Sequence, residues 1–156
     1  MAKYWYIGWA EYGRLADSLS VRIKSSGSEF DLVIGIARGG VPLAMVIADR
    51  IGVKMDMINV KSYTGIGRRV KPKILSTLMD GVKGRRILLV DDLVDHGETM
   101  KMLTEYLGAM RPSVLGTATL LKKPWSTFSP DYCLKTVDTW VVFPWEKEEA
   151  RRLRKR

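Results

Sequence analysis

Apolar residues recur along the chain with two spacings, and each spacing predicts a different kind of element. Over residues 9–24 they recur every three or four positions, which predicts an amphipathic helix. Residues 32–37, LVIGIA, are apolar throughout, as a parallel strand buried on both faces would be. Residues 86–91, RILLVD, have the same character and form the clearest predicted strand.

Strands and helices are predicted in alternation along the rest of the chain. A helix is expected over residues 41–51, with Pro42 in its first turn and Gly52 after its end, and another over residues 98–110. Further strands are expected at residues 53–60, 74–79, 113–121 and 132–137. This alternation predicts an α/β fold with an open, mostly parallel sheet flanked by helices.

The length and composition indicate a single domain over residues 1–156. Hydrophobic residues make up 46% of the chain, which is enough for one sizeable core. No apolar run approaches the ~18 residues of a spanning helix, and no apolar stretch of signal-peptide length begins the chain. The single cysteine, Cys133, cannot form an internal disulfide. We therefore expect a cytoplasmic protein without a membrane span.

The formal net charge is +9, and such a balance attracts polyanions, nucleic acid included. The last eleven residues, 146–156, carry six positive and three negative charges and are expected to form a solvated, frayed helix end. Residues 61–73 carry five cations, no acid and two glycines. Because cations in a glycine-containing loop often serve a ligand, we expect this basic loop to have a function.

Residues 87–99, ILLVDDLVDHGET, join the clearest predicted strand to a predicted helix. In parallel sheets, ligands bind outside the carboxyl ends of the strands. There, Asp91 and Asp92 offer oxygens to ribose hydroxyls and to Mg²⁺. The helix start offers backbone N–H groups, with Gly97 allowing close approach and Thr99 adding a hydroxyl, as a phosphate requires. The alternative is a strand end with an Asp helix cap and no ligand, but the whole pattern favours a ribose 5-phosphate site.

This segment resembles the 13-residue signature of the type I phosphoribosyltransferases, which bind 5-phosphoribosyl 1-diphosphate (PRPP). The resemblance implies a twisted open sheet with a small hood over the site. It implies a core over about residues 25–125, a hood from the N-terminal segment and about residues 126–146, and a basic tail over residues 147–156.

The resemblance also implies roles for individual residues of the signature. Asp91 and Asp92 would hold the ribose hydroxyls and Mg²⁺, and Asp95 would lie beside the purine N7 as general base. The residues that would bind the phosphate of PRPP are His96, Gly97, Glu98 and Thr99. His96 departs from the family, in which a Thr is usual. Either its ring donates to the phosphate or its backbone N–H does while the ring faces solvent.

Two further segments resemble parts of the same family. Residues 37–40, ARGG, would be an ordinary turn if taken alone, but they resemble the family's diphosphate loop, so Arg38 and Gly39 are expected to bind PRPP. That loop often carries a strained or cis peptide, expected here between Arg38 and Gly39. In the basic loop, Ser62 and Tyr63 resemble the catalytic pair of a mobile lid that excludes water. The alternative for this loop is a solvated hairpin tip.

The base is expected to bind downstream of the signature. Trp140 offers a flat face for stacking, the backbone of Val141 can read a purine edge, and Lys123 can donate to an exocyclic O6. Taken singly, the tryptophan would more often be core and the lysine surface. Together with Pro124 and the motif DTWVVFPWE at residues 138–146, they resemble the xanthine–guanine enzymes of bacteria and their archaeal relatives.

The resemblance therefore implies a purine phosphoribosyltransferase of nucleotide salvage, a pentosyltransferase. It would move ribose 5-phosphate from PRPP, with Mg²⁺, to N9 of guanine, hypoxanthine or xanthine, giving GMP, IMP or XMP. The alternatives are an enzyme for another base such as adenine, or a nucleic-acid-binding regulator that senses PRPP or a nucleotide. The signature favours an enzyme without a nucleic-acid partner.

A homo-oligomer, dimer or tetramer, is common in this family. The aromatic residues that could supply its interface, or equally the core, are Tyr4, Trp5, Tyr6 and Trp9.

Overall fold

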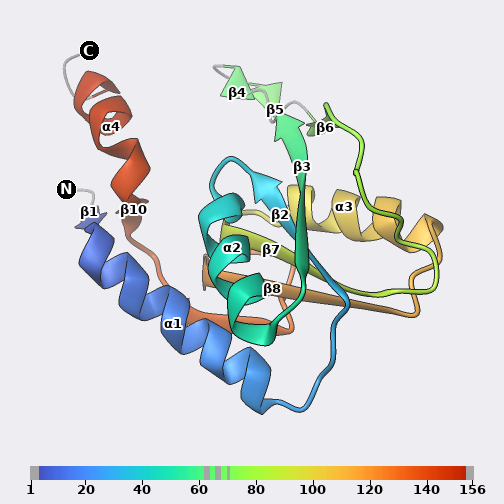
Figure 1. Cartoon of the computed structure of the whole chain (residues 1–156). Coiled ribbons are helices and arrows are strands. Elements are labelled where there is room, and N and C mark those ends of the chain that lie inside the picture. Colours follow the sequence, from blue (N-terminus) through green and yellow to red (C-terminus); the bar gives the residue numbers. More distant parts are fainter. Residues whose placement is uncertain (1–3, 62–63, 66–67, 70, 154–156) are drawn as a thin grey trace.

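The computed structural model describes residues 4–61, 64–65, 68–69 and 71–153. Its centre is a six-stranded sheet with helices on both faces (Figure 1). The strand order is β6–β3–β2–β7–β8–β9, and every pair is parallel except β3 with β6. The strands are β2 Leu32–Ala37, β3 Lys54–Lys61, β6 Lys73–Ile74, β7 Arg86–Val94, β8 Val114–Lys122 and β9 Tyr132–Thr136. The predicted α/β fold with a mostly parallel sheet is confirmed.

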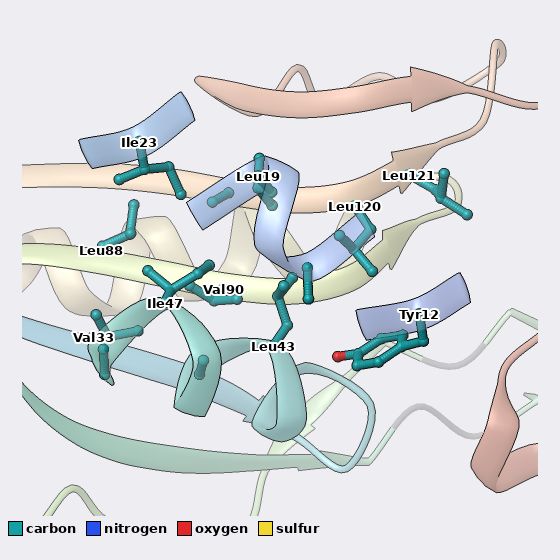
Figure 2. Close-up of a cluster of buried hydrophobic side chains, with 14 of the residues drawn as sticks. Tyr12, Leu19, Ile23, Val33, Leu43, Ile47, Leu88, Val90, Leu120 and Leu121 are labelled. Carbon is teal, nitrogen blue, oxygen red and sulfur yellow. The ribbon is translucent and has the colours of Figure 1, made fainter. Parts of the chain in front are cut away.

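Three helices cover the two faces of this sheet. Helices α1 (Trp9–Ser25) and α2 (Gly40–Ile51) lie on one face, and α3 (Glu98–Ala109) lies on the other (Figure 1). Side chains along β7 alternate between the faces. Leu88 and Val90 pack with α1 and α2, as Figure 2 shows, whereas Ile87 and Leu89 pack with α3. The central strands are therefore buried on both faces, which explains their unbroken apolar sequence.

A second, two-stranded sheet lies where the two ends of the described chain meet (Figure 1). Strand β1 (Tyr4–Tyr6) pairs in parallel with β10 (Trp140–Val142), which leads into the 3₁₀ turn η1 (Pro144–Glu146) and helix α4 (Lys147–Leu153). Neither strand is predicted by the hydrophobic pattern, because three residues are too few for a period to show. The boundaries of core and hood stay a prediction, and β9 belongs to the main sheet.

The aromatic residues at the N-terminus fall into two groups. Trp5 packs partly against the core, whereas Tyr4, Tyr6 and Trp9 are 44%, 43% and 62% exposed. Their part in an oligomer stays a prediction. Among the helices that the structure describes, none is long and apolar enough to cross a membrane.

The strand predicted at residues 74–79 is wrong beyond Ile74. Leu75 still donates its N–H to the carbonyl oxygen of Asn59 in β3, at 2.8 Å, but later backbone groups bond to a side chain. Met79 and Asp80 donate their N–H groups to the carboxylate of Asp56, at 2.7 and 2.9 Å. Ser76 accepts the N–H of Asn59 through its hydroxyl oxygen, at 2.8 Å. These side-chain acceptors satisfy the segment without a ladder, and an apolar pattern cannot reveal them.

The basic loop contains a small antiparallel pair, β4 (Thr64–Gly65) with β5 (Arg68–Arg69), between β3 and β6. The pair forms a hairpin, as the alternative of a solvated hairpin tip expected, and the mobile lid stays a prediction. Ser62 and Tyr63, the residues proposed for the lid, lie outside the described residues.

Candidate active site

The turn after β2 packs directly against the acidic end of β7. A Cβ atom on Gly39 would lie 2.1 Å from Oδ2 of Asp92, and one on Gly40 would lie 2.5 Å from the carbonyl oxygen of Val90. Any larger residue at these two positions would collide with the neighbouring strand. The predicted diphosphate loop and the predicted ribose acids therefore meet at one place in the fold.

The cis peptide in this turn lies between Ala37 and Arg38, one residue before the position expected from the resemblance. The expectation of a cis bond between Arg38 and Gly39 is wrong, and Gly39 has the helical backbone angles that lead into α2, with φ −61° and ψ −33°. The side chain of Arg38 is exposed and lies 3.7 Å from the carboxylate of Glu149.

Asp91 and Asp92 lie within β7, which pairs with β8 as far as Val94 and Lys122, beyond the predicted strand end at residue 91. Burial raises the pKa of Asp91 above its ordinary value, and the charge of Asp92 raises it further. Burial and the charge of Glu146 raise the pKa of Asp92 to about 6. Among the described residues, no lysine or arginine pairs with either carboxylate, although each accepts the N–H of the next residue.

Glu146 and Tyr12 also belong to this acidic end, and neither was assigned a role from the sequence. Burial raises the pKa of Glu146, and Glu149 adds to the rise, while Arg38 opposes it. Tyr12 is buried, and within the described part of the chain its hydroxyl has no hydrogen-bond partner. Burial and the charge of Asp92 raise the pKa of this phenol. Tyr12 sits on the apolar stripe of α1, so it looks like any other core residue.

Hard oxygen donors at this point suit a divalent cation, since two adjacent carboxylates would be neutralised by it. Across the described ranges, however, no group of three or more His, Cys, Asp or Glu side chains is placed to hold a metal ion. Asp91 and Asp92 alone offer two protein ligands. The remaining ligands of an ion bound here would have to come from water or a substrate.

The loop between β7 and α3 carries the expected acid and phosphate-binding residues. Gly97 precedes α3 with φ +98°, and the first backbone N–H groups of the helix start at Glu98. Asp95 is exposed, and its Oδ1 accepts a hydrogen bond from Nε1 of Trp125 at 2.8 Å. The ring of His96 lies beside the same oxygen, with Nε2 at 3.9 Å. A helix start without a side-chain cap is the geometry that binds a phosphate.

Gly97→Ala is expected to lower thermal stability and to raise the KM for PRPP. A Cβ at this position would come within 2.6 Å of Cβ of Phe128, and its φ is one that L residues rarely adopt. We expect a loss of roughly 2 kcal/mol in the free energy of unfolding, measured by denaturant titration. Gly81→Ala is the matched control, because nothing lies within 4 Å of its added Cβ. Equal effects of the two substitutions would contradict the tight packing at Gly97.

The residues expected to read the base lie on the other side of Asp95. Lys123 is only 8% exposed and donates from Nζ to the carbonyl oxygen of Thr139, next to Trp140. Burial lowers the pKa of Lys123, while the charges of Asp95 and Asp138 act in the opposite direction. Trp140 is 61% exposed, so its face is accessible. A hollow of about 170 Å³ is lined by Trp140, Val141, Val142, Glu146, Glu149 and Ala150.

The structure thus links several of the predicted residues by direct contacts. Asp95 and Lys123 are linked through Trp125, whose ring centroid lies 5.5 Å from Nζ of Lys123. Sequence reasoning missed Trp125, although it directly follows the Lys–Pro pair that drew attention. It also missed Glu146, the last residue of the motif DTWVVFPWE. In both cases the motif contained the residue, but only the fold shows which neighbour it faces.

Comparisons with known proteins identify what this chain resembles. The model of the phosphoribosyl transferase domain family matches residues 8–150. The xanthine-guanine phosphoribosyltransferase of Nitratidesulfovibrio vulgaris (strain DP4) is 33% identical over 149 residues, which covers 94% of this chain and 86% of the relative. The hypoxanthine phosphoribosyltransferase of Salmonella typhimurium is 35% identical over 118 residues, covering 74% of this chain and 64% of the relative.

A solved structure agrees in fold as well as in sequence. The crystal structure of a purine phosphoribosyltransferase from Pyrococcus horikoshii Ot3 superposes with a TM-score of 0.81 at 30% identity, and the match covers 92% of this chain and 94% of that one. The similarity therefore extends over most of the chain and is not confined to one motif.

Proposed function

Because the chain belongs to the phosphoribosyl transferase domain family, we propose that its site transfers the ribose 5-phosphate group of PRPP to N9 of a 6-oxopurine and releases diphosphate. The observation that carries this proposal is the junction of the turn at Gly39 with the acids of β7, next to a helix start that no side chain caps. One side of this junction accepts hydrogen bonds, and the other donates them. A phosphorylated ribose needs both.

PRPP would lie along this junction. The hydroxyls of its ribose donate to Asp91 and Asp92, and its 5-phosphate accepts from the backbone between His96 and Thr99. Its diphosphate faces the turn at Arg38 and Gly39 and the basic loop. The carboxylates of Asp91 and Asp92 suit Mg²⁺, which would neutralise charge on the diphosphate as it leaves.

The purine would lie between Asp95 and the segment that starts at Trp140. Lys123 is buried beside this segment, so its ammonium can donate to an exocyclic oxygen, and an amino group at the same position would be rejected. Asp95 accepts the N7 proton while N9 attacks C1 of the ribose and diphosphate departs. This arrangement favours guanine, hypoxanthine or xanthine over adenine, as the names of the relatives suggest.

The expected homo-oligomer and the cytoplasmic setting belong to the same proposal and stay predictions. A salvage enzyme meets PRPP and free purines where the cell makes and degrades nucleotides. The surface charge of +9 suits anionic substrates of this kind as well as it suits nucleic acid.

The test is to incubate the purified chain with PRPP, Mg²⁺ and one base at a time, and to measure diphosphate release. We expect release with at least one of guanine, hypoxanthine and xanthine, and little with adenine. No release with any of the three oxopurines would refute the proposal. A tight, salt-dependent complex with RNA or DNA in the absence of turnover would favour the regulator instead.

A further inference from the structure

The segment after β8, residues 123–128, holds the loop between β7 and α3 by its backbone. The N–H of Lys123 donates to the carbonyl oxygen of Val94 at 2.9 Å. The carbonyl oxygen of His96 accepts two hydrogen bonds from Thr127, one from the N–H at 3.1 Å and one from Oγ1 at 2.9 Å. The two loops therefore form one unit, and a side chain on the first has a fixed position relative to the second.

Trp125 is the residue of this segment whose side chain reaches the proposed general base. Its Nε1–H donates to Oδ1 of Asp95 at 2.8 Å, while the ring stays 49% exposed. Packing alone does not explain a large ring left half in solvent, whereas a tryptophan commonly uses its single N–H on a specific acceptor. The cation of Lys123, 5.5 Å from the ring centroid, restrains the ring further.

We propose that Trp125 is a positioning residue that orients Asp95 for the purine. An aspartate at the surface of a loop has two rotatable side-chain bonds, and a donor fixed on Oδ1 selects one orientation. Oδ2 is then left to face N7 of the base. The ring nitrogen of His96 lies 3.9 Å from Oδ1, which is too far for a hydrogen bond, so Trp125 holds this oxygen. The role rests on the proposed function, because it requires Asp95 to act on a purine.

Trp125→Phe tests this role, since it removes the N–H and keeps an aromatic face. We expect kcat to fall about tenfold, with the KM values for PRPP and base changed less than about twofold, because the carboxylate of Asp95 loses its fixed orientation and no substrate contact is removed. In an Asp95→Asn background the same substitution should change the residual rate by less than about twofold, because Trp125 acts through the carboxylate. Thermal melting checks that each variant is folded.

Thr127→Val is the matched comparison. It removes a hydrogen bond between the same two segments and leaves the partner of Asp95 in place. A larger loss of kcat in Trp125→Phe than in Thr127→Val supports the proposal, and equal losses would overturn it, because Trp125 would then only brace the loop. A raised KM for the base with unchanged kcat would also overturn it, as would a raised kcat. If the parent chain releases no diphosphate, the proposed function itself is refuted. If the parent chain is active and Trp125→Phe is unaffected, only the role of Trp125 is refuted.

Discussion

Asp95→Asn is expected to lower kcat for the preferred oxopurine by about 10²- to 10³-fold while leaving the KM for PRPP within about twofold of the parent value. The amide keeps the size of the side chain and an oxygen that can accept the N–H of Trp125, so the loop should stay in place. It cannot accept a proton from the purine. The loss should therefore fall on the chemical step, and steady-state rates at saturating PRPP measure it.

Asp49→Asn is the control for this substitution. Asp49 is exposed and lies near the end of α2 that is remote from Gly40, so the same chemical change occurs about 14 Å along the helix from the site. We expect its kcat to match the parent value. If Asp95→Asn retained full activity, another group would have to accept the proton, and the assignment of the general base would be lost.

The strands and the helix start that the sequence predicted correctly are explained by their neighbours along the chain. β2 and residues 87–90 of β7 are apolar at every position because both faces are covered, so the pattern alone predicts them. Gly97 and Thr99 lie at the start of a helix with a clear apolar stripe, so a helix start could be expected there. Local sequence thus predicted the sheet, the helices and the loop that carries Asp95.

The residues that the sequence missed depend on neighbours far along the chain. The carboxylates of Asp91 and Asp92 interrupt the apolar run, so the strand was predicted to end at residue 91. Pairing with β8 extends it to Val94. Trp125 faces Asp95 from 30 positions away, and Glu146 acts on Asp92 from 54 positions away. No periodicity encodes such contacts, because the fold alone brings these segments together.

Asp92→Asn is expected to stabilise the ligand-free protein at about pH 7.5 and to weaken PRPP binding. The pKa of Asp92 is raised to about 6, so the folded state holds its proton more tightly than the unfolded state does. As the pH rises from about 4 through about 6, the parent chain must bury a carboxylate charge and loses stability, and the asparagine variant does not. We expect a melting temperature roughly 5 °C above that of the parent at about pH 7.5, and little difference near pH 4.

Asp56→Asn gives the contrast that makes this prediction sharp. Asp56 is also buried, at 8% exposure, but its carboxylate accepts the N–H groups of Met57, Met79 and Asp80. An asparagine here replaces one acceptor oxygen by an NH₂ group, which would face the backbone N–H groups that the carboxylate now accepts. We therefore expect the substitution to lower the melting temperature. Asp92 has the opposite situation, because no cation among the described residues pairs with its carboxylate, which we expect to bind the ligand instead. PRPP with Mg²⁺ should accordingly raise the melting temperature of the parent chain more than that of Asp92→Asn. A variant destabilised equally at about pH 7.5 and near pH 4 would show that the carboxylate of Asp92 serves the fold instead of the substrate.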